Sequence, residues 1–215
     1  MKKISRLTSV IILTLGWAAA TKAGEHFSTF FLEYNPSTFH YSNTGVSNDA
    51  SYHAFSVGYN YFTPFYKGLG VDIGVKGQLF LNSEKEQGAK YKTNMLSATI
   101  PVDLAYDWRI SDGFAVYPYA GLYARLNISS TLKEEKTDEY VRKYNLFKKD
   151  DMAILSQESQ ESREAWKRFQ YGWQAGVNFR FSDFVTVGGG YFMDFNEIDN
   201  HTKIHGFNIT LGMNF

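Results

Sequence analysis

Cysteine, histidine and clustered glycine often mark catalytic or metal sites, and here none of them does so. The 215 residues contain no Cys, which excludes disulfides, thiolate metal ligands and cysteine nucleophiles. His201 and His205 are four apart, but in a loop leading into a strand this spacing does not bring two ligands onto one face as a helix would. Gly188–Gly190 lie in an expected strand with no helix after them, unlike a phosphate-binding loop. We therefore expect neither a metal site nor a cofactor.

Charged side chains on one side of the expected strands are better candidates for a polar site. Five are acidic and four are basic, so their charges nearly balance: Glu33, Asp72, Lys76, Asp103, Asp107, Arg109, Arg125, Arg180 and Asp194. Buried charges persist only when they are paired and hydrogen-bonded. If these residues point into a lumen, we expect a salt-bridge network that fills it. A narrow path for ions along the same residues is the alternative.

The elements that must position these charges are long alternating segments. In 113–128, Leu122 and Leu126 fall on one side, and Tyr123, Arg125 and Asn127 fall on the other. Successive side chains of a strand point to opposite faces, so the segment has one apolar and one polar face. The same pattern predicts eight strands, at 26–34, 51–62, 68–82, 94–110, 113–128, 168–182, 184–196 and 203–215. An aromatic content of 17% with only 4 Pro also favours strands.

The lengths and connections of these segments favour a barrel in a membrane over a lipocalin-like barrel or a sandwich. Several segments exceed the usual strand of about 5 to 6 residues. Short connections at 63–67, 111–112 and 182–183 alternate with longer ones at 35–50, 83–92, 129–167 and 197–202. Aromatic residues gather beside the short turns, as in the girdles of membrane barrels. Short turns at one end, long loops at the other and an even strand number are typical of outer-membrane barrels.

Residues 1–23 have the layout of a secretory signal peptide. Lys2, Lys3 and Arg6 precede an apolar run, and small residues follow it at a plausible cleavage site. Without these residues and their four cations, 18 basic residues remain against 22 acidic ones. We expect an exported protein, with 24–215 forming one domain. A mildly acidic mature chain is not typical of nucleic-acid binding, so we expect no nucleic-acid partner.

Three stretches carry a resemblance to a known family. The stretches IPVDLAY (100–106) and YPYAGLY (117–123) resemble strands of the outer membrane β-barrel (porin-like) domain family of Gram-negative bacteria, related in shape to small OmpA-type barrels. The last strand, 206–215, looks like the C-terminal signal read by the barrel-assembly machinery, and it ends on Phe215. The resemblance implies a cell outer membrane location, contact with outer-membrane lipid and lipopolysaccharide, and binding of the assembly machinery. It implies no active site.

A second resemblance concerns lipid modification. FHYSN (39–43) resembles the His-x-Ser-Asn stretch of lipid A deacylases, in which a serine nucleophile works with an adjacent histidine base and an acid. That family carries the motif near its last strands, whereas here it lies between the first two. The resemblance implies a nucleophile at Ser42 and a base at His40.

Taken together, the sequence predicts an all-β fold, an eight-stranded antiparallel up-and-down transmembrane β-barrel. About eight strands leave a lumen that side chains can fill, so an open diffusion pore is not expected. The long 129–167 connection, which could form a helix or an extended hairpin, is where we expect an extracellular partner to bind; a solvated charged loop is the alternative. We expect a structural or surface-interaction protein with no catalytic residues; the alternatives are a narrow porin-like channel and a lipid A-modifying enzyme.

Overall fold

The computed structural model describes residues 25–43, 46–86, 89–137, 140–159 and 164–215. The predicted signal peptide, 1–23, lies outside these residues. Most of the described chain is β-structure. The strands are β1 (Phe27–Asn43), β2 (Val46–Tyr66), β3 (Leu69–Glu86), β4 (Ala89–Tyr106), β5 (Trp108–Ser111), β6 (Phe114–Thr137), β7 (Tyr140–Asn145), β8 (Phe169–Phe181), β9 (Val185–Asp194) and β10 (Thr202–Asn214), and a helix, α2 (Lys149–Ser159), follows β7.

Eight strands close into one antiparallel ring. Their order is β1-β2-β3-β4-β6-β8-β9-β10; β10 pairs with β1, and β6 pairs with both β4 and β8. β5 continues the line of β4 after a break at Asp107, whose amide donates to the carbonyl of Gly68 at 2.8 Å. β7 lies outside the ring and pairs with β6. The predicted eight-stranded barrel is confirmed, although the expected single strand at 94–110 is two strands.

The two faces of the barrel wall are those that the alternation predicted. Large apolar side chains point outward, with Leu122 61% and Phe207 60% exposed, whereas the inward Arg125 is 1% exposed. A soluble barrel would bury its apolar face and expose its charges. This reversed arrangement is typical of a barrel whose outer solvent is hydrocarbon.

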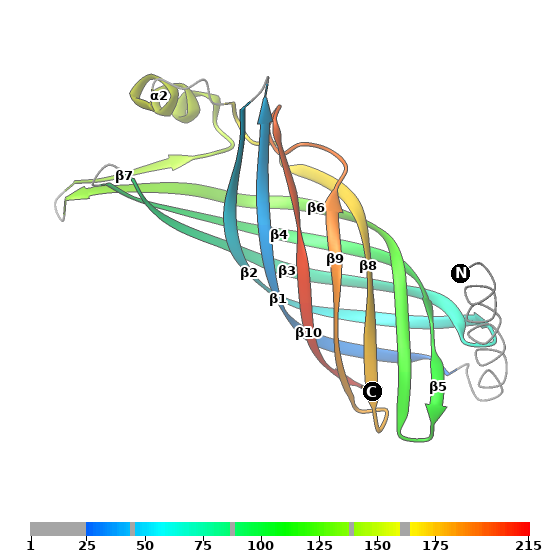
Figure 1. The fold of residues 1–215 in the computed structure, drawn as a ribbon. Coiled ribbons are helices and arrows are strands. Elements are labelled where there is room, and N and C mark those ends of the chain that lie inside the picture. Colours follow the sequence, from blue (N-terminus) through cyan, green and yellow to red (C-terminus); the bar gives the residue numbers. More distant parts are fainter. Residues whose placement is uncertain (1–24, 44–45, 87–88, 138–139, 160–163) are drawn as a thin grey trace, which may run out of the picture.

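Tight turns gather at one end, which we call the turn end (Figure 1). Lys67 and Gly68 have φ of 41° and 87°, and Ser182 and Asp183 have φ of 50° and 54°. Two successive residues with left-handed φ in a turn match the twist of the paired strands. Because β2 runs to Tyr66, the predicted five-residue link at 63–67 is wrong. The C-terminus also lies at this end, beside the β8–β9 turn.

At the opposite end, which we call the hairpin end, strands continue where loops were predicted. The expected loop 35–50 is the paired upper part of β1 and β2, and the expected loop 83–92 is that of β3 and β4. The pattern there is reversed: Phe39 and Tyr52 are buried inside, while His40 faces outward. The prediction followed an apolar outer stripe, and that stripe ends below this region.

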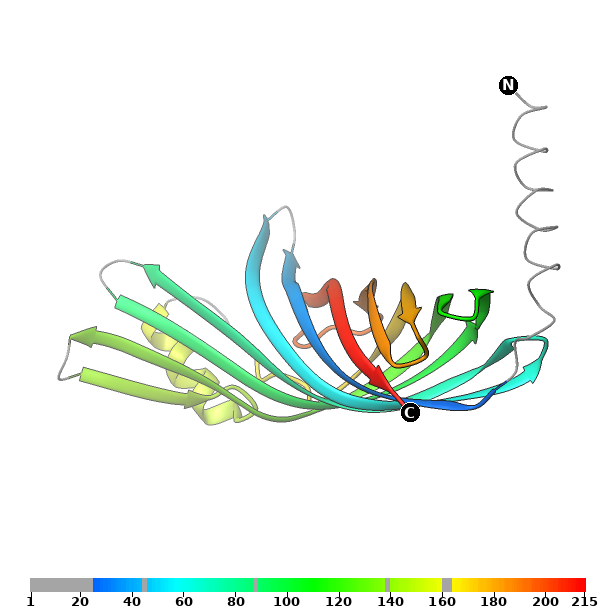
Figure 2. The same ribbon diagram turned by 90° about the horizontal axis from the view of Figure 1, so that it is seen from below.

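The 129–167 connection is also more ordered than a loop. β6 continues to Thr137 and turns back as β7, and α2 follows. Figures 1 and 2 show the β3–β4 and β6–β7 hairpins projecting to the side where α2 lies. The inward side chains of this hairpin and of α2 share one apolar cluster, formed by Leu132, Tyr144, Leu146, Met152 and Leu155. The helix and the extended hairpin that the composition permits are thus both present.

A β-bulge changes the facing of β6 as it enters this hairpin. Ser97 pairs with Asn127 and Leu96 pairs with Ser129, so Ile128 has no partner on β4. Ile128 and Ser129 are both exposed, and the residues beyond them have the opposite parity. Extra residues of this kind interrupt the alternation of a strand locally.

Among the described residues, no helix is long and apolar enough to cross a membrane.

Candidate functional site

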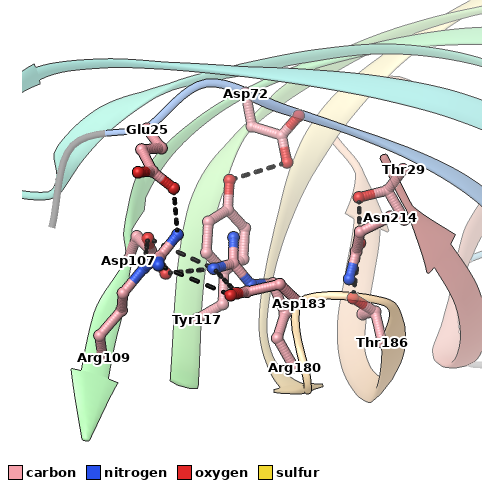
Figure 3. A network of polar contacts seen from close by, with 10 residues as sticks. All are labelled: Glu25, Thr29, Asp72, Asp107, Arg109, Tyr117, Arg180, Asp183, Thr186 and Asn214. Carbon is pink, nitrogen blue, oxygen red and sulfur yellow. Dashed lines mark hydrogen bonds and ion pairs between the residues drawn. The ribbon is translucent and has the colours of Figure 1, made fainter. Parts of the chain in front are cut away.

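The charged residues inside the barrel form three layers along the lumen, and the first lies at the turn end. Figure 3 shows the contacts of this first layer around Asp107, Arg109 and Arg180. Asp107, fully buried, lies 3.3 Å from the guanidinium groups of both Arg109 and Arg180. Arg180 also contacts Asp183 at 3.0 Å, and Arg109 contacts Glu25 at 3.2 Å. The break between β4 and β5 places Asp107 at the centre of this cluster. The lumen is therefore crossed by alternating charges at this end.

Neutral hydrogen bonds join the strands around this cluster. The amide oxygen of Asn214 accepts from the hydroxyls of Thr29 and Thr186 at 2.8 and 2.9 Å (Figure 3). β10 is thereby linked to both of its neighbours, β1 and β9. Arg180 also stacks over the ring of Phe27, with 4.0 Å between the guanidinium carbon and the ring centroid. Such a contact stabilises a cation shielded from water.

The middle layer combines one ion pair with two carboxylates. Lys76 donates to Glu33 at 2.9 Å, and both side chains are more than nine-tenths buried. Asp72 and Asp103 lie directly opposite each other on β3 and β4. Asp72 accepts from the hydroxyl of Tyr117 at 3.1 Å, so its hydrogen bonds come from neutral donors rather than from a cation.

A small cavity adjoins these carboxylates. It has a volume of about 30 Å³ and is lined by Glu33, Asp72, Lys76 and Asp103, among others. Asp103 accepts from Gln174 at 2.7 Å, but its second oxygen, like that of Asp72, has no hydrogen-bond partner among the described residues. A volume of this size holds one or two water molecules. Water in this cavity would satisfy both oxygens.

The third layer lies toward the hairpin end. Arg125 pairs with Asp194, which also accepts a hydrogen bond from the hydroxyl of Tyr123. The guanidinium group of Arg125 stacks over Phe80, at 5.5 Å from the ring centroid. Beyond this layer, buried apolar side chains fill the barrel, including Phe39, Tyr52, Phe80, Met95, Phe192, Ile198 and Ile204.

The structure thus brings seven of the nine candidate residues into three groups of charge contacts and leaves Asp72 and Asp103 hydrogen-bonded to neutral groups. The alternation of charged residues does not identify Glu25 and Asp183, which lie outside the alternating segments, or Gln174, which is uncharged. The tyrosines Tyr117 and Tyr123 were recognisable because they share the polar parity of 113–128. Their hydroxyl partners on other strands depend on register.

The three histidines singled out from the sequence, His40, His201 and His205, have different partners. Nδ1 of His40 lies 2.6 Å from Oδ1 of Asp49, on the paired strand β2. Ser42 is two residues from His40 on the same face of β1. His205 packs against the ring of Tyr191 and His201 against that of Tyr41. Within the described part of the chain, no three His, Cys, Asp or Glu side chains are arranged to hold a metal ion.

A closed barrel with an apolar outer face and a polar lumen defines an integral outer-membrane protein. The family model described as outer membrane protein beta-barrel domain matches residues 9–215, and the chain belongs to this family, which places it in the cell outer membrane. No curated protein sequence matches it.

Solved structures of small outer-membrane barrels share the fold. Ail of Yersinia pestis, in complex with the heparin analogue sucrose octasulfate, is 11% identical, with a TM-score of 0.50, covering 89% of this chain and 99% of Ail. Neisserial surface protein A is 15% identical, with a TM-score of 0.43 and coverage of 88% and 95%. OprG of Pseudomonas aeruginosa is 15% identical, with a TM-score of 0.44 and coverage of 90% and 97%.

Proposed function

We propose that this protein is a surface-interaction protein, with a lumen plugged by its own side chains and a binding surface outside the cell. This surface, which we call the platform, is formed by the β6–β7 hairpin and α2. The observation that carries the proposal is the docking of α2. Met152 and Leu155 are buried against Leu132 and Tyr144 of the β6–β7 hairpin. A connection that only joins two strands has no need of an apolar core of its own. The core gives this part of the chain a fixed shape, as a binding surface requires.

The orientation of the barrel follows from its ends. Outer-membrane barrels have short turns in the periplasm and longer connections outside the cell. The turn end, with Phe215, is therefore periplasmic and available to the assembly machinery, and the hairpin end is extracellular. A folded platform at that end is exposed to partners on the cell surface.

Two features of the interior support a closed lumen. The ion pairs cross the interior at three levels, and the apolar cluster around Phe80 and Phe192 fills the hairpin end. The polar cavity beside Asp103 favours a narrow channel as an alternative. Planar-bilayer recording separates the two: absence of conductance steps supports the plug, and regular steps of one size support a channel.

Undocking α2 tests the platform. Met152→Asp with Leu155→Asp places two charges in the apolar cluster, whereas Ala153→Asp adds a charge at an exposed position of the same helix. Proteoliposomes carrying each protein are compared on an array of extracellular glycans and matrix proteins. The heparin analogue bound to Ail makes a sulfated glycan a useful first probe. We expect the double variant to lose a binding signal that the control keeps; native protein that binds nothing on the array would contradict the proposal.

The pairing of His40 with Asp49 favours a second candidate, hydrolysis of a lipid ester. A serine nucleophile requires a histidine base oriented by an acid. Asp49 lies at 2.6 Å from His40, and Ser42 follows on the same outward face, where lipid can reach it. Incubation with lipopolysaccharide, with Ser42→Ala as control, tests this function. Unchanged lipid A mass with the native protein would exclude deacylation.

A further inference from the structure

The outward face of the hairpin end carries a row of lysines that we call the lysine ladder: Lys85, Lys90, Lys92, Lys133 and Lys143. Strand register places them side by side. Lys85 is opposite Lys90 across β3 and β4, Lys92 is opposite Lys133 across β4 and β6, and Lys133 is opposite Lys143 across β6 and β7. One positively charged surface therefore spans four strands.

The alternation of each strand shows that the ladder points away from the barrel interior. On β4, Lys90 and Lys92 share the parity of the exposed Leu96, whereas Met95 is buried. On β6, the bulge at Ile128 turns Leu132 inward and Lys133 outward. The inner side of this hairpin is already covered by α2, so the outer side is the free one.

The ladder holds far more positive than negative charge. Glu135, opposite Lys90, is the one carboxylate that alternation places on this face among the described residues of the two hairpins. Lys92 donates to it at 2.8 Å, and this hydrogen bond, with Lys90 and Lys133 nearby, lowers the pKa of the Glu135 carboxyl. Like charges directly opposite on paired strands are destabilising. Five lysines against one carboxylate leave a cationic surface that an anionic partner would stabilise.

The height of the ladder identifies the partner. Lys92 lies four residues beyond Leu96, which at about 3.3 Å per residue is about 13 Å along the strand. Leu79 and Leu96 belong to the apolar outer band, so the ladder begins just above it. Lipid headgroups lie at this level. In the outer leaflet of a bacterial outer membrane, the headgroups carry the phosphates of lipopolysaccharide.

We propose that the lysine ladder binds the phosphate groups of lipopolysaccharide in the outer leaflet. Ammonium groups bind phosphate oxygens through charge-assisted hydrogen bonds. The proposal rests on the extracellular orientation given under the proposed function, but it needs no protein partner and uses the face opposite to α2. If the ladder proves not to bind lipopolysaccharide, the proposal that the platform binds an extracellular partner still stands. If the platform proves to bind no partner, the proposal for the ladder still stands.

The test uses the full chain in detergent micelles and fluorescent lipopolysaccharide with a bisphosphorylated lipid A. Lys92→Gln, Lys133→Gln and Lys143→Gln are combined in one variant. The matched control combines Lys148→Gln, Lys149→Gln and Lys203→Gln, three exposed lysines off the ladder. Each lysine near an anionic surface adds to the attraction, so the ladder variant should bind at least tenfold more weakly, and the control should change less than twofold.

Further arms decide between phosphate and other anions. Dephosphorylated lipid A should bind the native protein as weakly as lipopolysaccharide binds the ladder variant. The milder pair Lys133→Gln and Lys143→Gln, which keeps the Lys92–Glu135 contact, should show an intermediate loss, and unheated gel mobility reports folding of each variant. Equal affinity of the native protein and the ladder variant for lipopolysaccharide would overturn the proposal, and so would an equal loss in both triple variants. Heparin is the second anion: a ladder variant that loses affinity for heparin but not for lipopolysaccharide would also overturn it.

Discussion

Ser28 and Phe215 exchange two backbone hydrogen bonds, the amide of each donating to the carbonyl of the other at 2.9 and 3.0 Å. These bonds join the first and last strands of the described chain at the turn end. An open sheet edge in hydrocarbon leaves polar backbone groups without partners, so membrane strands must close into a ring. The final residue is therefore part of the closure.

Replacing Ser28 with Pro removes the amide that donates to Phe215. Ser28→Ala is the matched control, because it loses only the hydroxyl that contacts Tyr59 at 2.7 Å. We expect the proline variant to be less stable than the alanine variant by about 1 to 3 kcal/mol, from the lost hydrogen bond and the constraint on the strand. Urea unfolding in detergent micelles measures the difference. Coincident unfolding curves for the two variants would contradict this closure.

Because the outer face is apolar only along part of each strand, we expect the cost of an outward-facing arginine to depend on its depth in the membrane. Leu122→Arg places a cation in the apolar band, and we expect a cost of about 2 to 4 kcal/mol in the free energy of unfolding from a bilayer. Thr131→Arg makes a cationic substitution on the outward face of the same strand, beyond the bulge, and should cost less than about 1 kcal/mol. Reversible folding into liposomes measures both. Similar costs would mean that the band does not end where the pattern changes.

Because Arg125 and Asp194 form a buried ion pair, we expect the effects of their substitutions on the free energy of unfolding to be strongly coupled. Asp194→Asn leaves the buried guanidinium group without its counter-charge, which should cost about 3 to 5 kcal/mol. The double change Asp194→Asn with Arg125→Met removes the uncompensated charge and should recover most of that loss, because apolar replacements of buried pairs are often neutral. A double-mutant cycle by denaturant unfolding checks this. Additive costs would show that the two residues are not paired.

The lysines around Glu135 predict that its carboxyl group titrates at a lower pH than that of a free glutamate. Its pKa is lowered in the folded protein, chiefly because Lys92 donates a hydrogen bond to the carboxylate. The contact therefore stabilises the folded state above the unfolded pKa and is lost as pH falls through the folded pKa. Carboxyl NMR shifts of Glu135 should titrate below those of a free glutamate. In Lys92→Gln the midpoint should move upward, and an unchanged midpoint would exclude this cause.

Sequence patterns predicted the parts of the strands that cross the membrane, because an apolar outer stripe is strict wherever hydrocarbon is the solvent. Leu122 and Arg125 illustrate how clearly the two faces separate there. The patterns failed from Asn35 and Ser83 onward, where both faces meet water or the chain's own core and the stripe disappears. The break at Asp107 could not be foreseen either, since it depends on a hydrogen bond to Gly68 in another turn.

The partners of the charged residues were less predictable than their positions. Alternation places Asp72 and Asp103 on the inner side, but which groups meet across the lumen depends on the stagger between strands. Glu33 lies 43 positions from Lys76 in the sequence, and Arg125 lies 69 from Asp194. No local spacing encodes such distant contacts.

Ile128, which has no partner on β4, divides β6 into two parts whose outward-facing residues have opposite parity. Below it, even-numbered residues meet lipid; above it, odd-numbered residues face outward, so that Leu132 reaches α2 and Lys133 faces the opposite way. If β6 kept its regular alternation through residues 128 and 129, without the bulge, Leu132 would turn outward and Lys133 inward. One extra position thus lets a continuous strand serve hydrocarbon first and then a core of its own.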